Sequence, residues 1–322
     1  MQDTLPAPVK PDISIVERHA RASVSMRVRR PEWVILAFLV YAPLVASLLP
    51  AAPSVTYRLC WLNPSVILAY LVLIHFDSRN PVLALSVIRD WLPLGLVLLA
   101  YREMGWFALP HATAALESHW VIWDRLVLRG GAKAAIEAFG PVLPSILEIA
   151  YALVYALAPF SIAVLYIYRR RQFVDRFLFV FVLGVLLCYA QFPFWPSEPP
   201  RLVFFGQDFP SYDTVFRRFN WWMLGSCGIH TSVFPSAHVA GAFAAAFGLR
   251  QAMPRRQWPV RLLFIIAVLI AVATVYGRYH YLADATAGLL MAVVAVALAK
   301  YGLPALLYRE RSHFPKILTE ES

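Results

Sequence analysis

The sequence predicts an all-α integral membrane protein of about eight transmembrane helices, and three observations lead to that fold class. Of the 322 residues, 60% are hydrophobic and only 15% are charged, whereas a soluble domain of this length needs a more polar surface. The apolar residues are gathered in runs of about 17 to 25, enough to cross a hydrocarbon core of about 30 Å. Most of the 29 lysines and arginines lie between these runs, where they orient membrane helices.

The predicted spans are helices because a backbone within lipid has to satisfy its own hydrogen bonds. In chain order they are residues 33–49, 59–76, 91–109, 142–168, 173–194, 236–253, 261–276 and 282–306. A basic tail, residues 1–32, precedes them, and a second tail, residues 307–322, follows them. We expect the two helices within residues 33–90 to be an addition to a six-helix unit over residues 91–306.

The positive charges between the apolar runs predict that both tails are cytosolic. The end of the fifth helix and the starts of the sixth and eighth then share the outer or lumenal face. Two segments on that face, residues 110–140 and 195–234, are too long for simple turns, and loops of this length commonly serve a site. The first has the mixture of aromatic and charged residues typical of a helix lying in the membrane interface.

Several function classes are not supported by the sequence. The net charge of +10 does not indicate nucleic-acid binding, because no basic stripe is interleaved with aromatic residues. No P-loop, His-Glu-x-x-His or paired-cysteine motif is present, and we expect no cofactor and no metal. The cysteines have no paired spacing, so a bridge between two of them is left open: Cys60, Cys188 and Cys227.

Histidines and an aspartate at the predicted outer ends indicate phosphoryl-transfer chemistry. His280 and Asp284 are four residues apart at a helix start, so they share one face. The carboxylate can orient the ring and leave its other nitrogen free as a nucleophile, although such a pair taken alone could also ligate a metal. His238, at the start of the sixth helix, can protonate a departing alkoxide. We predict that these three residues are catalytic.

Three further residues are candidates for binding the phosphate. Arg201 and Arg278 offer planar guanidinium forks for its oxygens, and Ser236 adds a hydroxyl beside a helix N-terminus. Each also has a structural explanation, since Arg201 could be an interfacial anchor and Ser236 a helix cap.

Possible substrate contacts lie nearby in the predicted topology. Glu148 is an intramembrane carboxylate, a residue type that is costly and often functional, with a local hydrogen bond as the alternative. Trp221 and Trp222 could hold a head group or belong to an interfacial aromatic belt.

Two motifs resemble those of a known family. The segment Phe-Pro-Ser-Ala-His ending at His238 resembles the Pro-Ser-Gly-His element of the type 2 phosphatidic acid phosphatase superfamily. His280, Asp284 and Gly288 are similar to its His-x-x-x-Asp element and the Ala-Gly that follows. The resemblance covers residues 91–306 and implies a six-helix phosphatase-type bundle. It further implies a metal-independent reaction with a phosphohistidine at His280, oriented by Asp284, and His238 as the acid.

The chain also departs from the family pattern. Phe194 and Leu202 stand where the first element has a lysine and a proline. Thr274 stands where the third has an arginine, a charge that Arg278 could replace. In these departures the chain looks more like the inositol phosphorylceramide synthase and sphingomyelin synthase branch.

The resemblance therefore implies transfer of a phospho group or phospho-head-group from a lipid phosphate or phospholipid donor to an alcohol or lipid acceptor. A lipid phosphate phosphatase that uses water is the alternative. A non-catalytic transporter or scaffold with a decayed site is the second alternative.

Overall fold

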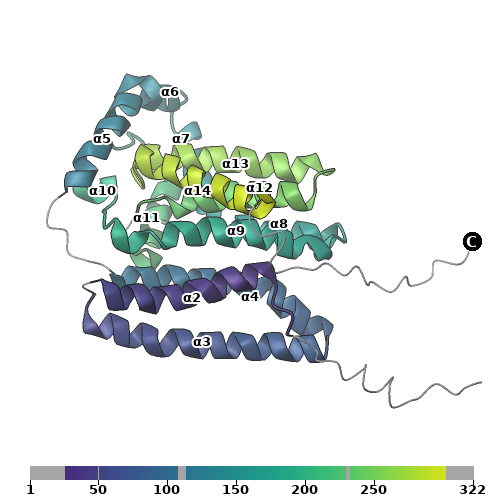
Figure 1. Cartoon of the computed structure of the whole chain (residues 1–322). Coiled ribbons are helices and arrows are strands. Elements are labelled where there is room, and N and C mark those ends of the chain that lie inside the picture. The colour runs from purple at the N-terminus through teal and green to yellow at the C-terminus, as the bar shows by residue number, and fades with distance from the viewer. Residues whose placement is uncertain (1–25, 50, 108–113, 230–232, 302–322) are drawn as a thin grey trace, which may run out of the picture.

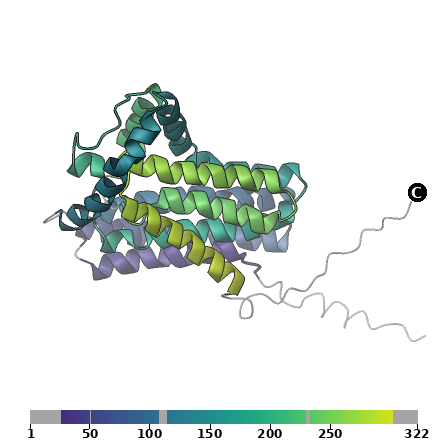
Figure 2. The same ribbon diagram turned by 90° about the horizontal axis from the view of Figure 1, so that it is seen from above.

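The structure is a computed structural model in which residues 26–49, 51–107, 114–229 and 233–301 are described. Every regular element in these residues is helical, which confirms the predicted all-α fold class. Most of the long helices run along one common direction, and the segment containing α5 and α6 projects from one end, as Figures 1 and 2 show. The predicted tail 307–322 and residues 1–25 of the tail 1–32 lie outside the described residues.

Three N-terminal helices form one layer of the molecule (Figure 1). They are α2 (Arg30–Leu48), α3 (Pro53–Arg79) and α4 (Leu83–Met104). The first turns of α2 and α3 contain proline, which is tolerated there because the first N–H groups of a helix have no intrahelical partner. Buried side chains of α2, α3 and α4 share one core cluster with those of α9, so this layer is packed directly onto the rest of the bundle.

The second part of the bundle has a central pair of helices, α9 (Val174–Tyr189) and α12 (Ala237–Ala252). The helices around this pair are α7 (Val142–Ala152), α8 (Val154–Ile167), α13 (Gln257–Tyr276) and α14 (Leu282–Tyr301). Small residues allow α9 and α12 to approach closely. A Cβ added to Gly184 would lie 2.9 Å from the Cβ of Ala244, and one added to Gly248 would lie 3.0 Å from the carbonyl oxygen of Phe177.

The chain is a multi-pass membrane protein. Six helices in the described residues are long and apolar enough to cross a bilayer, or seven if Ala115–Glu137 and Val142–Ala152, bent by 108°, count as one span. The sequence predicts about eight spans, and the difference from six or seven has a structural reason. The expected span 142–168 is two helices that meet at Leu153, and the span 236–253 is the 16-residue α12. Most of α12 is buried inside the bundle, so it is enclosed by other helices rather than by lipid.

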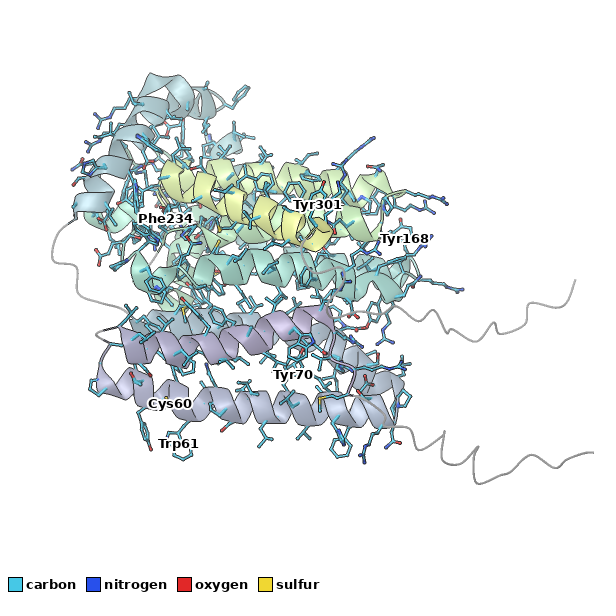
Figure 3. The ribbon with its side chains drawn as sticks, in the orientation of Figure 1. Cys60, Trp61, Tyr70, Tyr168, Phe234 and Tyr301 are labelled. Carbon is cyan, nitrogen blue, oxygen red and sulfur yellow. The ribbon has the colours of Figure 1, made fainter. Side chains whose placement is uncertain are left out.

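The two long segments predicted on one face cover the same end of the bundle. The first contains α5 (Ala115–Val127), the π-helical turn Leu128–Ala132 and α6 (Lys133–Glu137), and the second contains α10 (Pro200–Val203) and α11 (Val215–Cys227). We call the described residues of 110–140 and 195–234 the roof, and the end that they cover the site end. Arg125 and Arg129 pair with Asp208 at 3.5 and 2.8 Å, which joins the two segments. Figure 3 labels Phe234 at the site end and Tyr168 near the opposite end.

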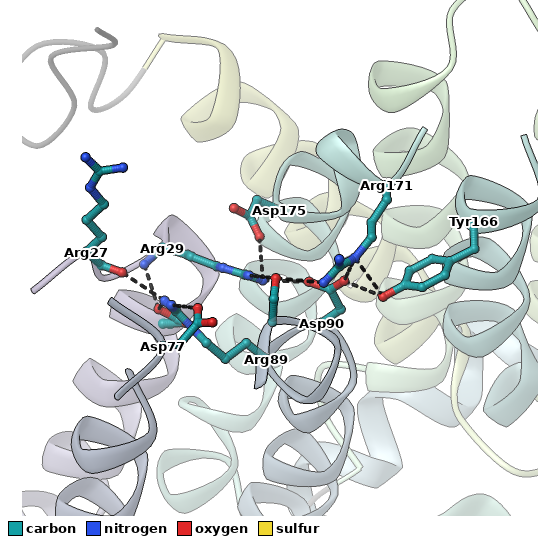
Figure 4. A network of polar contacts seen from close by, with 10 residues as sticks. Arg27, Arg29, Asp77, Arg89, Asp90, Tyr166, Arg171 and Asp175 are labelled. Carbon is teal, nitrogen blue, oxygen red and sulfur yellow. Dashed lines mark hydrogen bonds and ion pairs between the residues drawn. The ribbon is translucent and has the colours of Figure 1, made fainter. Parts of the chain in front are cut away.

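A network of charges joins the helices at the opposite end (Figure 4). Asp90 of α4 accepts from Arg29 and Arg171, both at 2.6 Å, and from the Tyr166 hydroxyl. Arg89 bonds the carboxylates of Glu32 and Asp77 at 2.7 and 2.6 Å. We call this network the clasp; its members are Arg29, Glu32, Asp77, Arg89, Asp90, Tyr166, Arg171 and Asp175. The clasp ties α2, α3 and α4 to the α8–α9 region.

Candidate functional site

The two predicted catalytic histidines meet at the site end. His238 lies in the first turn of α12, and His280 lies in the loop before α14. Their ring centroids are 5.5 Å apart, with the rings tilted by 56°. The two helix starts are joined directly, since the Ser236 backbone N–H donates to the Asp284 carbonyl at 3.0 Å.

Gly288 allows this close approach of α12 and α14. A Cβ at Gly288 would lie 2.3 Å from the Ser236 carbonyl oxygen, far inside van der Waals contact. The glycine that resembles part of the family motif therefore has a packing role, because it brings the start of α12 beside the His280 loop.

His280 and Asp284 adopt the predicted pairing. The ring Nδ1 lies 3.3 Å from Asp284 Oδ2, and the same oxygen accepts the Tyr281 backbone N–H at 2.9 Å. Asp284 is fully buried and His280 is 6% exposed. With Nδ1 directed at the carboxylate, Nε2 is the ring nitrogen that Asp284 does not engage.

The surroundings of His280 favour its neutral form. Burial is the main cause that lowers its pKa from 6.5 to about 3, the positive charge of Arg201 lowers it further, and a backbone hydrogen bond with Val233 opposes the shift. The imidazole is therefore uncharged at neutral pH. A neutral ring nitrogen with a free lone pair is the form that a nucleophile requires.

His238 is held by aromatic rings. Tyr151 stacks on it with centroids 5.0 Å apart and planes within 10°, and Tyr155 meets it edge-on at 6.0 Å. Tyr151 also stacks on Tyr279 at 4.1 Å. The His238 Nε2 is buried and has no hydrogen-bond partner among the described residues. The stack therefore orients a ring whose nitrogen is unoccupied.

Arg201 supplies a positive charge beside the histidines. Its Nη1 donates to the Tyr279 carbonyl at 3.4 Å, its guanidinium lies 5.8 Å from the centre of the Tyr279 ring, and its backbone N–H donates to the Arg278 carbonyl at 3.2 Å. Burial lowers the pKa of Arg201 from its usual value, but arginine stays protonated at neutral pH. No carboxylate pairs with this guanidinium among the described residues.

These groups share one cavity of about 220 Å³. Arg201, His238 and His280 line its polar part, together with five tyrosines, Tyr101, Tyr151, Tyr155, Tyr189 and Tyr279. A cavity with a cationic fork, a neutral histidine and a second histidine suits a phosphate ester, because these groups provide charge stabilisation, a nucleophile and a proton donor. No group of three His, Cys, Asp or Glu side chains that could hold a metal ion occurs in the described part of the chain.

The other two predicted phosphate-binding residues do not line this cavity. Arg278 is fully buried, has a left-handed backbone (φ 64°) and pairs with Asp124 of the roof at 2.5 Å. Asp124 also accepts the Leu282 backbone N–H at 2.8 Å, so the pair holds the loop that carries His280. Ser236 is the N-cap of α12, and its hydroxyl accepts from the Val239 N–H at 3.4 Å.

The predicted substrate contacts also lie outside the cavity lining. Glu148 is buried and accepts from Arg217 at 3.1 Å, from the Asn220 side chain at 2.7 Å and from the Tyr279 hydroxyl at 2.5 Å. It thus fits the hydrogen-bonding alternative and links the roof helix α11 to the aromatic stack. Trp221 lies against Arg217, and Trp222 is 67% exposed.

Several residues of this arrangement could not be identified from the sequence. Tyr151 and Tyr155 contact the His238 ring, and Tyr279 stacks on Tyr151. Asp124 binds Arg278, and Arg217 and Asn220 hold Glu148. Tyr279 could have been identified from the sequence, because it directly precedes His280. The others pair with partners far away along the chain, such as Asp124 with Arg278 at a separation of 154 residues, and no local spacing reveals such a pair. All three cysteines are free.

Comparison with known proteins identifies the family. No curated protein and no solved structure matches the chain. One family model does match, over residues 131–298, and this segment contains His238, His280, Asp284 and Arg201. Since the match covers more than half of the chain, this protein belongs to the PAP2 superfamily and is an enzyme of the phosphatase type.

Proposed function

We propose that this chain transfers the phospho group or phospho-head-group of a lipid phosphoester to an alcohol acceptor through a phosphohistidine at His280. The observation that carries the proposal is the convergence of His280, His238 and Arg201 on one cavity, with Asp284 paired to the His280 ring behind it. Membership of the PAP2 superfamily supports the coarser activity, a phosphatase-type reaction on a lipid phosphoester.

In the first step, His280 Nε2 attacks the phosphorus of the donor. The new N–P bond forms as the P–O bond to the leaving alcohol breaks, and His238, protonated when the donor binds, gives its proton to the departing oxygen. Arg201 stabilises the negative charge on the non-bridging oxygens. Asp284 holds the His280 ring and balances the positive charge that develops on it.

In the second step, the acceptor hydroxyl attacks the phosphohistidine. His238, now neutral, takes the proton of the acceptor, the N–P bond breaks, and the new P–O bond restores free His280. With an alcohol the product is a new phosphoester, and with water it is free phosphate or a free phospho-head-group. The same residues therefore serve either reaction, and the acceptor decides between them.

The roof supports transfer to an alcohol over hydrolysis. Trp120 of α5 stacks on Phe234 at 5.0 Å and meets Tyr281 at 5.6 Å, next to the loop that carries His280. A transferase has to limit the access of water to its intermediate and hold the acceptor in line. A cover of aromatic rings over a nearly buried nucleophile suits that requirement.

The proposed topology has the site end on the outer or lumenal face and both termini in the cytosol. Exposed arginines at the opposite end support it, since basic residues favour the cytosolic side: Arg169, Arg170, Arg255 and Arg256. A cysteine introduced at Gln207 should react with an impermeant reagent in intact cells. Reaction only after permeabilisation would contradict this topology.

The experiment uses the purified protein and a donor labelled in its phosphorus. A rapid quench should trap an acid-labile, base-stable phosphoenzyme, which His280→Ala cannot form. Mass spectrometry of the products, with and without diacylglycerol or polyol acceptors, should find the label in a new phosphoester. Vanadate should inhibit and EDTA should not.

The alternatives predict different products. Free phosphate or free phospho-head-group with every acceptor would make the enzyme a hydrolase. No turnover of any donor would favour the transporter or scaffold.

A further inference from the structure

The cavity that contains the histidines continues into an apolar leg. Part of its lining comes from residues of four helices: Leu94, Val97 and Leu98 of α4, Val154, Ala158 and Pro159 of α8, Phe181 and Val185 of α9, and Gly241 of α12. The lining residues of α4 follow a spacing of three and four, so they form one face of that helix. Leu94 is seven residues from Tyr101, which makes the leg about 10 Å deep at 1.5 Å per residue.

Gly241 contributes to the space at the back of the leg. It belongs to α12, one turn beyond His238. A Cβ at this position would already approach the side chain of Val185 at 3.3 Å and that of Phe181 at 3.7 Å. The absence of a side chain at Gly241 therefore keeps the leg continuous with the histidines.

The leg opens sideways between α4 and α8. Leu98 and Tyr155 line the cavity, and they are 55% and 48% exposed, so no other side chain closes the cavity over them. Leu98 is six residues from the end of α4, or about 9 Å along the helix, and Tyr155 lies near the middle of the α7–α8 segment. In a chain that spans about 30 Å of hydrocarbon, this opening faces lipid tails rather than water.

We propose that the leg holds one hydrocarbon chain of the donor lipid and that α4 and α8 form the lateral opening through which the donor arrives from the bilayer. The proposal rests on the proposed function, because the phosphate of the same molecule would meet His280 and Arg201. A molecule that fits the whole cavity has to be anionic at one end and hydrocarbon at the other.

The main contribution of the leg is to position the donor lipid. Lipid tails are as apolar as the side chains of the leg, so moving a chain from the bilayer into it releases little free energy. A chain fixed in the leg instead directs the phosphate at the catalytic nitrogen. Since α4 lies outside the segment 131–298 that matches the family, part of the chain-length preference is set by a helix outside the matched segment.

Ala158→Phe tests the leg, because it places a ring in the space assigned to the hydrocarbon chain. Its matched control is Ala156→Phe, the same change two residues away on the exposed side of α8. The ratio of kcat/KM for a long-chain phosphatidate to that for a short-chain one, in the same micelles, should fall about tenfold in Ala158→Phe. The ratio should stay at the wild-type value in Ala156→Phe. Val97→Phe, from the opposite wall, replaces Ala158→Phe if the latter fails to fold.

A second measurement does not depend on turnover. A long-chain phosphatidate with a diazirine on its hydrocarbon chain should label residues 94–101 and 154–159, and Ala158→Phe should reduce that labelling. Labelling of these segments without turnover of any donor would overturn the proposed function and support the leg. Labelling elsewhere, or equal kcat/KM ratios in the two alanine variants, would overturn the leg.

Discussion

The site and the clasp are two charged clusters in one helical bundle, at opposite ends, and they differ in how far their charges are paired. In the clasp, each arginine guanidinium meets at least one carboxylate, and Asp90 alone binds Arg29 and Arg171. At the site, the Arg201 guanidinium contacts only a carbonyl and an aromatic ring among the described residues, and His238 Nε2 has no partner.

The difference separates a cluster whose charges are paired within the chain from one that is open to a ligand. A buried charge is costly unless it is paired, and the clasp pairs its charges within the chain. The site leaves a cation and a ring nitrogen directed at a cavity, so an anion from outside can complete the pairing. Burial and charge are common to both ends, and unpaired groups beside a cavity are what distinguish the site.

The largest effect is expected from removing the nucleophile. His280→Ala should lower turnover by about 10⁴-fold or more, since loss of a covalent nucleophile removes the reaction path itself. Turnover and phosphoenzyme formation would be measured at equal amounts of folded protein. His119→Ala, which changes an exposed histidine of the roof, is the control. A His280→Ala enzyme that still forms the phosphoenzyme would contradict the assignment.

The next largest effect concerns His238. His238→Ala should slow a donor with a poor leaving group by about 10²–10⁴-fold, the range of general acid catalysis. A donor whose leaving group needs no proton, such as an aryl phosphate, should recover part of this loss in the His238 variant alone. Equal recovery in the His280 variant would remove the distinction between acid and nucleophile.

The clasp should affect stability and leave the chemistry intact. Asp90→Ala removes the shared partner of Arg29 and Arg171 and should lower the free energy of unfolding by about 2 kcal/mol, less than for a fully buried pair because both arginines are partly exposed. Thermal unfolding in detergent and turnover per folded enzyme would be measured together. Asp213→Ala, from an exposed pair with Arg218 at 4.0 Å, should change neither. A loss of turnover at unchanged stability in Asp90→Ala would make the clasp part of the reaction.

The smallest effect is the pH dependence of stability. Because the pKa of His280 is lowered from 6.5 to about 3, the unfolded chain binds a proton below about pH 6.5 that the folded chain does not. The neutral His280 therefore stabilises the fold above pH 6.5, and this contribution is lost as the pH falls from 6.5 toward 3, by at most about 1.4 kcal/mol per pH unit. Between pH 7 and pH 5, the unfolding temperature of His280→Asn should fall less than that of the wild type. Identical slopes would mean that His280 is not buried in its neutral form.

The pairing of His280 with Asp284 could be predicted because it depends on local spacing. His280 and Asp284 are one helical turn apart, and the Nδ1 to carboxylate contact follows from that register. His238 lies at the start of a helix on the face that charge counting assigned to the site. The number of spans was less predictable, because a hydrophobic run does not reveal a break such as the one at Leu153.

The different roles of Arg201 and Arg278 could not be predicted from the sequence. Arg201 and Arg278 carry the same fork and lie near the same motifs, yet one lines the cavity and the other is paired with Asp124. In the sequence, Glu148 is an equally plausible substrate contact. In the structure, its carboxylate accepts hydrogen bonds from Arg217, Asn220 and Tyr279. These outcomes depend on partners that arrive from other segments.

By itself, the sequence determined the all-α membrane class, the helices and the histidine–aspartate pair, because lipid imposes helices on apolar runs and helical periodicity is local. The tertiary structure decided which arginine stays unpaired, which rings orient His238 and where the cavity reaches the lipid. Those properties depend on which side chains from distant segments come into contact, and that choice is made only when the helices pack.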